Sequence, residues 1–308
     1  MSHFWSTAWQ RAWRSIRQRG VNIARALALL VLSLVGSTKL SASDSNSPTS
    51  ANELMRRIIS NELKAEAQDH SHWMFRQQTE KPGSGPEIDD VVETRSGDLT
   101  FPIAKNGREL SRQQKTELEQ HIQQLVRNPG DLQKSLKAKN EDEARTQRLL
   151  KMFPQAFDFS YAEQHGDLVH LNFRPKPEFH PNSREAQVFH AMEGSVWVDR
   201  KQSRLSEMAG HLMHEVKFVG GFLGHLDKGG QFEVKQAEVA PGYWELTLLN
   251  VQMRGKALFF KTISVQQRYS RSNLRMVPDN LTLEQAAELL HNQVFAPAKN
   301  ERASASQR

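Results

Sequence analysis

The second half of the chain carries eight short runs in which apolar and polar residues alternate, and this pattern constrains the fold most. Such alternation puts the apolar side chains on one face, which is typical of strands buried on one side. Turn signals such as Lys228-Gly229-Gly230, Pro241-Gly242 and Arg254-Gly255 separate the runs. Links this short leave no room for parallel crossovers, so the pattern predicts an antiparallel meander. The runs cover 157–162, 167–174, 194–199, 204–210, 214–219, 231–239, 243–251 and 256–269.

Helical patterns are available to cover the apolar face of this meander. Apolar residues at helical spacing predict a helix over 51–67, a charged helical hairpin at about 108–152, and a C-terminal helix from Thr282. Ser/Thr followed three residues later by Glu/Gln predicts capping boxes at Ser50, Ser111 and Thr282. A meander of this size must curl or pack against something. We therefore predict an α+β fold: a strongly curved antiparallel sheet, an unclosed half-barrel, with helices packed on its concave side.

The remaining segments complete a prediction of one domain over 51–296. Val91 and Val92, with a turn near Ser96-Gly97, indicate a further strand pair, and the neighbouring acids Asp89-Asp90 are expected to be solvated. Residues 44–50 form a polar linker without periodicity, and the polar tail 297–308 is expected to be disordered.

The N-terminal 43 residues hold the whole charge excess of the chain. The net charge is +6, and residues 1–43 contain six basic residues and no acid, which leaves 35 of each in 44–308. An apolar run over 26–36 and small residues up to Ser43 follow the basic part, the layout of a secretory signal peptide. As a helix, these eleven apolar residues would extend about 16 Å, which is too short to span comfortably the roughly 30 Å hydrocarbon core of a bilayer.

These features predict a periplasmic or otherwise exported protein with a signal peptide over about 1–43, the alternative being an uncleaved N-terminal anchor. The membrane would be contacted only through this segment. Because the chain contains no cysteine, a lipid-modified N-terminal cysteine is excluded. The balanced charge of the rest removes the electrostatic case for nucleic acid as a partner.

The sequence offers weak support for enzymatic chemistry. The absence of cysteine excludes a thiol nucleophile and cysteine-ligated metal sites. Neither a His-Glu-x-x-His nor a Gly-x-Ser-x-Gly pattern occurs, and the glycines at 220–224 are not followed by Gly-Lys-Ser/Thr. We therefore expect no catalytic residue, no metal and no cofactor, and we keep a hydrolase with an unrecognised site as a minor alternative.

Four stretches carry a resemblance to a known family: Phe173-Arg174-Pro175-Lys176-Pro177-Glu178-Phe179-His180-Pro181, Ser183-Arg184-Glu185, Met192-Glu193-Gly194-Ser195-Val196-Trp197-Val198-Asp199 and Lys256-Ala257-Leu258-Phe259-Phe260-Lys261. With the leader, the meander and the inserted helices, they resemble the LolA/LolB-like superfamily of periplasmic lipoprotein-sorting carriers, in particular a group of bacterial envelope proteins given this fold. The resemblance implies a half-barrel that holds acyl chains between sheet and helices. No functional residue of a carrier matches a position here.

An acyl-binding cavity needs large apolar side chains and few polar groups. By alternation, Trp244, Leu246 and Leu248 are expected to share a face. Leu258 and Phe260 are likewise expected to share a face, with Ala257 and Phe259 on the other. The alternative is that these side chains form an ordinary core. The candidate lining residues are Trp197, Phe218, Phe232, Trp244, Leu246, Leu248, Leu258 and Phe260.

The function expected from this combination is non-enzymatic binding of an apolar ligand in the cell envelope, either lipoprotein acyl chains or another lipid. The alternative is an envelope sensor or protein-interaction module of the same fold. In that case the charged hairpin residues 131–148 would dock an envelope protein partner.

Overall fold

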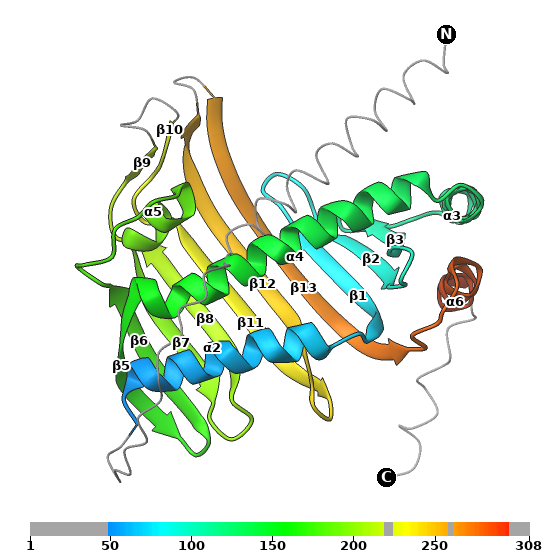
Figure 1. Ribbon diagram of the computed structural model, residues 1–308. Coiled ribbons are helices and arrows are strands. Elements are labelled where there is room, and N and C mark those ends of the chain that lie inside the picture. Colours follow the sequence, from blue (N-terminus) through cyan, green and yellow to red (C-terminus); the bar gives the residue numbers. More distant parts are fainter. Residues whose placement is uncertain (1–48, 219–223, 258–260, 296–308) are drawn as a thin grey trace, which may run out of the picture. The chain divides into compact units, whose positions relative to one another are not determined.

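The computed structural model describes residues 49–218, 224–257 and 261–295 of the chain (Figure 1). The predicted signal peptide 1–43, most of the linker 44–50, Leu258 and Phe260, and the tail 297–308 lie outside the described residues. The described strands pair antiparallel in the order β4-β3-β2-β1-β13-β12-β11-β8-β7-β6-β5, with β9 and β10 attached beside β12. Among these strands the terminal β4 and β5 do not pair with each other, so the sheet is open. The predicted α+β class with an unclosed antiparallel sheet is confirmed.

Five helices and thirteen strands make up the described part of the chain. The helices are α2 (Ala51–Gln68), α3 (Arg112–Arg127), α4 (Gly130–Ala156), α5 (Arg184–His190) and α6 (Leu283–Phe295). The strands are β1 (His72–Glu80), β2 (Glu87–Val92), β3 (Leu99–Lys105), β4 (Arg108–Glu109), β5 (Phe157–His165), β6 (Leu168–Pro175), β7 (Met192–Asp199), β8 (Arg204–Leu212), β9 (Val216–Phe218), β10 (Gly224–Leu226), β11 (Gln231–Ala240), β12 (Tyr243–Ala257) and β13 (Lys261–Val277).

The contacts of the chain group into two compact units. The first comprises the chain up to His70 together with Thr79–Gly83 and Ala138–Arg271; the second comprises Ser71–Gln78, Ser84–Lys137 and the chain from Ser272. Each unit has its own apolar core. A single domain over 51–296 stays a prediction.

In the first unit the strands present one apolar and one polar face. On β6, Val169, Leu171 and Phe173 are buried, whereas His170 is half-buried and Asn172 is exposed between them. We call the apolar side the inner face and the polar side the outer face. Helix α2 and the second half of α4 run across the inner face (Figure 1), so the alternation seen in the sequence does separate core from surface.

Helix α2 is held to the sheet at both ends by polar contacts. Ser50 caps the helix by accepting a hydrogen bond from the Glu53 amide at 3.2 Å, and Asn52 Oδ1 accepts one from the amide of Phe159 at 2.9 Å. Near the other end, buried Glu62 accepts from the Arg204 guanidinium at 3.0 Å and from the Leu205 amide at 2.6 Å. Because these contacts satisfy Glu62, its burial is compensated.

The second unit is built from β2, β3, α3, α6 and the adjoining parts of β1, β13 and α4. Helix α3 begins with the reciprocal capping box predicted at Ser111 and Gln114, and Thr282 and Gln285 exchange the same pair of hydrogen bonds before α6. The side chains of its core come from all of these elements: Met74, Val92, Leu99, Phe101, Ile122, Leu132, Val277, Leu283, Ala286, Ala287 and Leu290.

The expectation that Asp89 and Asp90 are solvated is wrong. The two residues are 3% and 0% exposed. Arg76 donates to both carboxylate oxygens of Asp90 at 2.8 and 3.0 Å, and this hydrogen bonding raises the pKa of Arg76 above its ordinary value. The sequence indicated only a polar stretch between turns, whereas in the structure both acids lie on β2 and the ionic partner of Asp90 comes from the preceding strand β1.

Two helical features also differ from the sequence prediction. Helix α4 continues through Pro154 to Ala156 rather than ending near residue 152. The carbonyl of Ala156 accepts from the Lys176 amide at 2.9 Å, and that of Pro154 from Lys176 Nζ at 3.4 Å, so partners from beyond β6 stabilise this last turn. The short helix α5, capped by Ser183, was not predicted.

A pair of glycines brings β7 and β8 close together under two aromatic rings. Gly194 and Gly210 are register partners. A Cβ on Gly194 would lie 2.0 Å from the carbonyl oxygen of Ala209 and 2.7 Å from the ring of Phe173, and a Cβ on Gly210 would lie 2.6 Å from the ring of Phe232. The paired backbone of β7 and β8 and the packed rings cannot move aside as the end of a flexible side chain can. Neither glycine can therefore be replaced by a larger residue without a shift of the strands or the rings.

Replacing Gly194 by alanine should therefore destabilise the protein by about 3 kcal/mol, since the strands must separate or the rings must move. Urea unfolding followed by circular dichroism measures the change. Gly130→Ala is the matched control, because its Cβ would meet nothing nearer than Asn128 Oδ1 at 3.8 Å; it should cost nothing measurable. Equal effects of the two substitutions would contradict the close approach.

Candidate functional site

The predicted lining residues belong to the first unit, and six of the eight lie in described parts of the chain. Leu258 and Phe260 lie outside them. The six are divided between the faces of the sheet rather than gathered on one surface. We describe them in the order of the strands.

Trp197 lies on the outer face. It stands between Val196 and Val198 on β7, both 0% exposed and part of the core. Its ring stacks on that of His170 with centroids 4.4 Å apart and 3° between the planes. Alternation along β7 thus points Trp197 away from the inner face.

Phe232 lies on the inner face and is 8% exposed, within the main core. Its ring covers Gly210, whose missing side chain makes room for it. Phe218 on β9 is half-buried and packs against the same core.

A bulge in β12 separates the other three candidates. Leu246 pairs with Gln236 and Leu248 pairs with Lys235, so Thr247 is an extra residue between them. Register partners point to the same face of a sheet, and the consecutive residues Lys235 and Gln236 point to opposite faces. Leu246 and Leu248 therefore point to opposite faces, and the expectation that they share one is wrong. Trp244 donates its indole N–H to Gln202 at 2.9 Å, and the Arg204 guanidinium lies over its ring.

The inner face is filled by aromatic rings at one end. Phe153 of α4 lies 4.9 to 6.1 Å, between ring centroids, from four other phenylalanines. All five rings are buried. The space between α4 and β5–β6 is therefore occupied by protein, as in an ordinary core. The five residues are Phe153, Phe157, Phe159, Phe173 and Phe189.

Toward β8, β11, β12 and β13, the inner face is less completely covered. Val234 follows Phe232 on the same face of β11 and pairs with Met208 of β8. Both are only half-buried, and so are Leu246 and Val265, although all four pack against the main core. We call Met208, Val234, Leu246 and Val265 the open apolar patch. Sequence analysis missed three of its members because it favoured aromatic residues, although their alternation with buried neighbours was visible.

A group of carboxylates lies where α2 faces α4. Glu66 of α2 interacts with Glu143 and Glu62, with a hydrogen bond from Gln147 and the charge of Lys151 in partial compensation. Burial, and next the negative charge of Glu143, raise the pKa of the Glu66 carboxyl from 4.5 to about 7. The contact between the two covering helices therefore carries a proton that titrates near neutrality.

The described residues contain no cluster of three or more His, Cys, Asp and Glu side chains able to hold a metal ion. In the same part of the chain, no helix is both long and apolar enough to cross a membrane.

Glu66→Gln should stabilise the protein at alkaline pH. Below pH 4.5 the Glu66 carboxyl is protonated in both the folded and the unfolded state, and above pH 7 it is ionised in both. Because ionisation costs more in the folded state, the free energy of unfolding falls as the pH rises from 4.5 to about 7. After allowance for solvent screening we expect a gain of about 1 kcal/mol at pH 8 and none at pH 4. Urea titrations at both pH values test this, with exposed Glu141→Gln as the control; a gain independent of pH would contradict it.

Comparison with known proteins does not assign the chain to a family. No family model matches it, and no curated protein does. A DUF1329 family protein from Desulfovibrio piger, known from its crystal structure, is a structural neighbour with a TM-score of 0.28 and 12% identity, over 79% of this chain and 100% of that one. A likeness of this size carries no argument about function.

Proposed function

We propose that the protein binds an apolar ligand non-enzymatically on the inner face of the sheet in its first unit, and that the ligand is an acyl chain of a lipoprotein or of another lipid. The observation that carries the proposal is the open apolar patch. Met208, Val234, Leu246 and Val265 face the helix-covered side of the sheet but remain half-buried. Apolar surface left partly in water gains free energy when a ligand covers it.

The covering helices give this surface a suitable boundary. Helix α2 is attached through Asn52 and Glu62, and α4 is anchored by the phenylalanine cluster. An acyl chain on the patch would thus lie beside rigid packing, which lowers the entropic cost of binding. The resemblance to periplasmic lipoprotein-sorting carriers supports the same class of ligand, and transfer would need only competition between the patch and an acceptor.

The double substitution Met208→Gln with Val234→Thr tests this proposal. It makes the patch polar, so the affinity for cis-parinaric acid, a fluorescent 18-carbon fatty acid, should fall about tenfold. Fluorescence titration of the purified chain measures it, together with native mass spectrometry for lipid that copurifies. Val169→Thr is the control, because Val169 is 0% exposed on β6, in the filled part of the core; it should lower stability and leave affinity unchanged. Absence of both lipid and parinarate binding would refute the proposal.

We further propose that this binding takes place in the cell envelope after export directed by residues 1–43. The charge pattern of the sequence supports it: six basic residues precede the apolar run, and no acid occurs before Asp44. Expression of the full chain in a Gram-negative host should give a periplasmic form whose N-terminus, determined by Edman sequencing, lies close to Asp44. A cytoplasmic protein that still begins at Met1 would contradict export, and a membrane-bound one that begins there would indicate the uncleaved anchor.

A further inference from the structure

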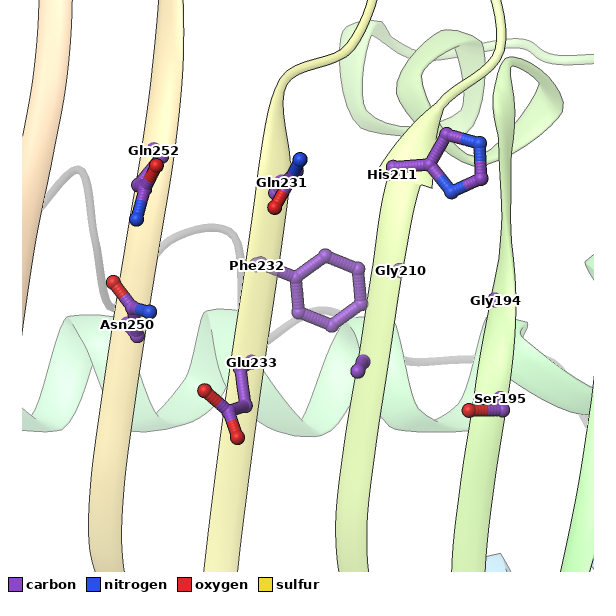
Figure 2. A pocket seen from close by; sticks show the side chains of 10 residues that line it. Gly194, Ser195, Gly210, His211, Gln231, Phe232, Glu233, Asn250 and Gln252 are labelled. Atoms are coloured by element: carbon purple, nitrogen blue, oxygen red, sulfur yellow. The ribbon is translucent and has the colours of Figure 1, made fainter.

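The outer face of the first unit carries a furrow that runs across the strands. Two adjoining depressions occupy this face, and both are lined by Gly194, Ser195 and His211. One extends over β5 and β6 to Asp158 and Asn172, and the other over β11 and β12. Figure 2 shows the second depression, with its polar side chains standing on neighbouring strands and α4 behind the sheet.

The strand register explains why the two depressions are continuous. One row of outward-facing residues crosses six strands in succession, each residue being the register partner of the next. Apart from Glu233, whose carboxylate is bound by Lys235, the side chains of this row are shorter than those beside it, so the floor lies below its neighbours. At about 4.8 Å between strands the row is about 24 Å long. The floor residues are Ser160, Asn172, Ser195, Ala209, Glu233 and Asn250.

Longer side chains form a ridge on each side of the floor. Glu193 lies 3.4 Å from Arg174 and 3.4 Å from His211, which joins three strands of one ridge. The same ridge continues through Gln231 and Gln252. The opposite ridge contains the stacked His170–Trp197 pair, Glu207 and Lys235, with Lys235 Nζ at 3.1 Å from Glu207 and 3.0 Å from Glu233.

The furrow offers amide groups that the protein itself does not use. In the described part of the chain the side chains of Asn172, Gln231, Asn250 and Gln252 make no hydrogen bond to protein. Each can donate two hydrogen bonds and accept two. The backbone groups of β6, β7, β8, β11 and β12 are already paired with strands on both sides, and only β5, at the edge of the sheet, has an unpaired side. Over most of the furrow a ligand must therefore be recognised by side chains.

The charge of the furrow limits the ligand further. Its floor and ridges contain four acids, Asp158, Glu193, Glu207 and Glu233, against two bases, Arg174 and Lys235. This balance disfavours phosphate and sulfate groups, and therefore nucleic acid and anionic polymers. An extended peptide lying across the strands would find unpaired strand backbone only at the edge strand β5. A neutral chain with many hydroxyl groups suits the mixture of amide, carboxylate and hydroxyl partners.

We propose that this furrow is a binding site for a neutral, linear oligosaccharide, separate from the apolar ligand proposed for the inner face. The sugar hydroxyls would pair with the free amides of the floor and ridge, and the chain would lie across the strands from β5 to β12. Ser195 and Ala209 would allow it to approach the sheet closely at the middle of the furrow.

Calorimetric titration of the full chain with cellohexaose, chitohexaose and maltohexaose tests the proposal. At least one should bind, with a dissociation constant between about 10 µM and 1 mM. Ser195→Trp fills the floor and should weaken binding more than about tenfold. Ser270→Trp is the matched control, since Ser270 faces outward on β13 beside Leu248, outside the six strands of the furrow; it should leave binding unchanged.

Three results would overturn the proposal: no binding of any of the three sugars at millimolar concentration, tighter binding of a sulfated heparin hexasaccharide than of the neutral ones, or unchanged binding by Ser195→Trp. If that variant fails to fold by circular dichroism, Asn172→Ala and Asn250→Ala decide instead. Each deletes one amide and should weaken binding roughly three- to tenfold, and unchanged affinity in both would refute the site. Parinarate binding of these variants should stay at the wild-type value, which separates this proposal from the one on the inner face.

Discussion

An open antiparallel sheet with one apolar face cannot be stable until something covers that face, and the first unit of this protein is organised by that requirement. Helices α2 and α4 provide the cover. Their positions depend on a few polar contacts, above all the buried Glu62 of α2, which accepts from Arg204 and from the backbone of β8. Without such contacts an apolar stripe on a helix could slide over an apolar sheet, because the hydrophobic effect has no direction.

The cover is complete at one end of the inner face and partial at the other. Phe153 meets four phenylalanine rings over β5 and β6, and small residues at Gly194 and Gly210 let Phe173 and Phe232 lie flat against the sheet. Over β8, β11, β12 and β13 no comparable aromatic cluster occurs among the described residues, and Met208, Val234, Leu246 and Val265 keep part of their surface. This difference between a filled and an open end is the basis for the proposal that an apolar ligand binds this face.

The polar face follows from the same alternation. Residues between the core positions point outward, and their side-chain lengths vary in rows because neighbouring strands are in fixed register. A row of side chains that are short except for Glu233, between two rows of longer ones, forms a furrow without any loop or helix contributing to it. The Lys235 bridge to Glu207 and Glu233 and the Glu193 contacts with Arg174 and His211 stiffen its sides. The two faces of one sheet therefore present surfaces of opposite polarity, and the two proposed ligands differ accordingly.

Local pattern in the sequence determined the antiparallel strands after Pro154, the capped starts of α2, α3 and α6, and the α+β class, because capping and alternation depend on residues only a few positions apart. The position of Trp197 on the outer face could also have been predicted from its neighbours, since the apolar residues Val196 and Val198 on either side of it occupy the inner face. Tertiary structure alone decided the rest. Three features depend on partners in a different element of the fold: the Thr247 bulge that separates Leu246 from Leu248, the pairing of Asp90 with Arg76, and the continuation of α4 through Pro154. The register across six strands, which aligns Ser160 with Asn250, is likewise a sum of pairings that no single segment specifies.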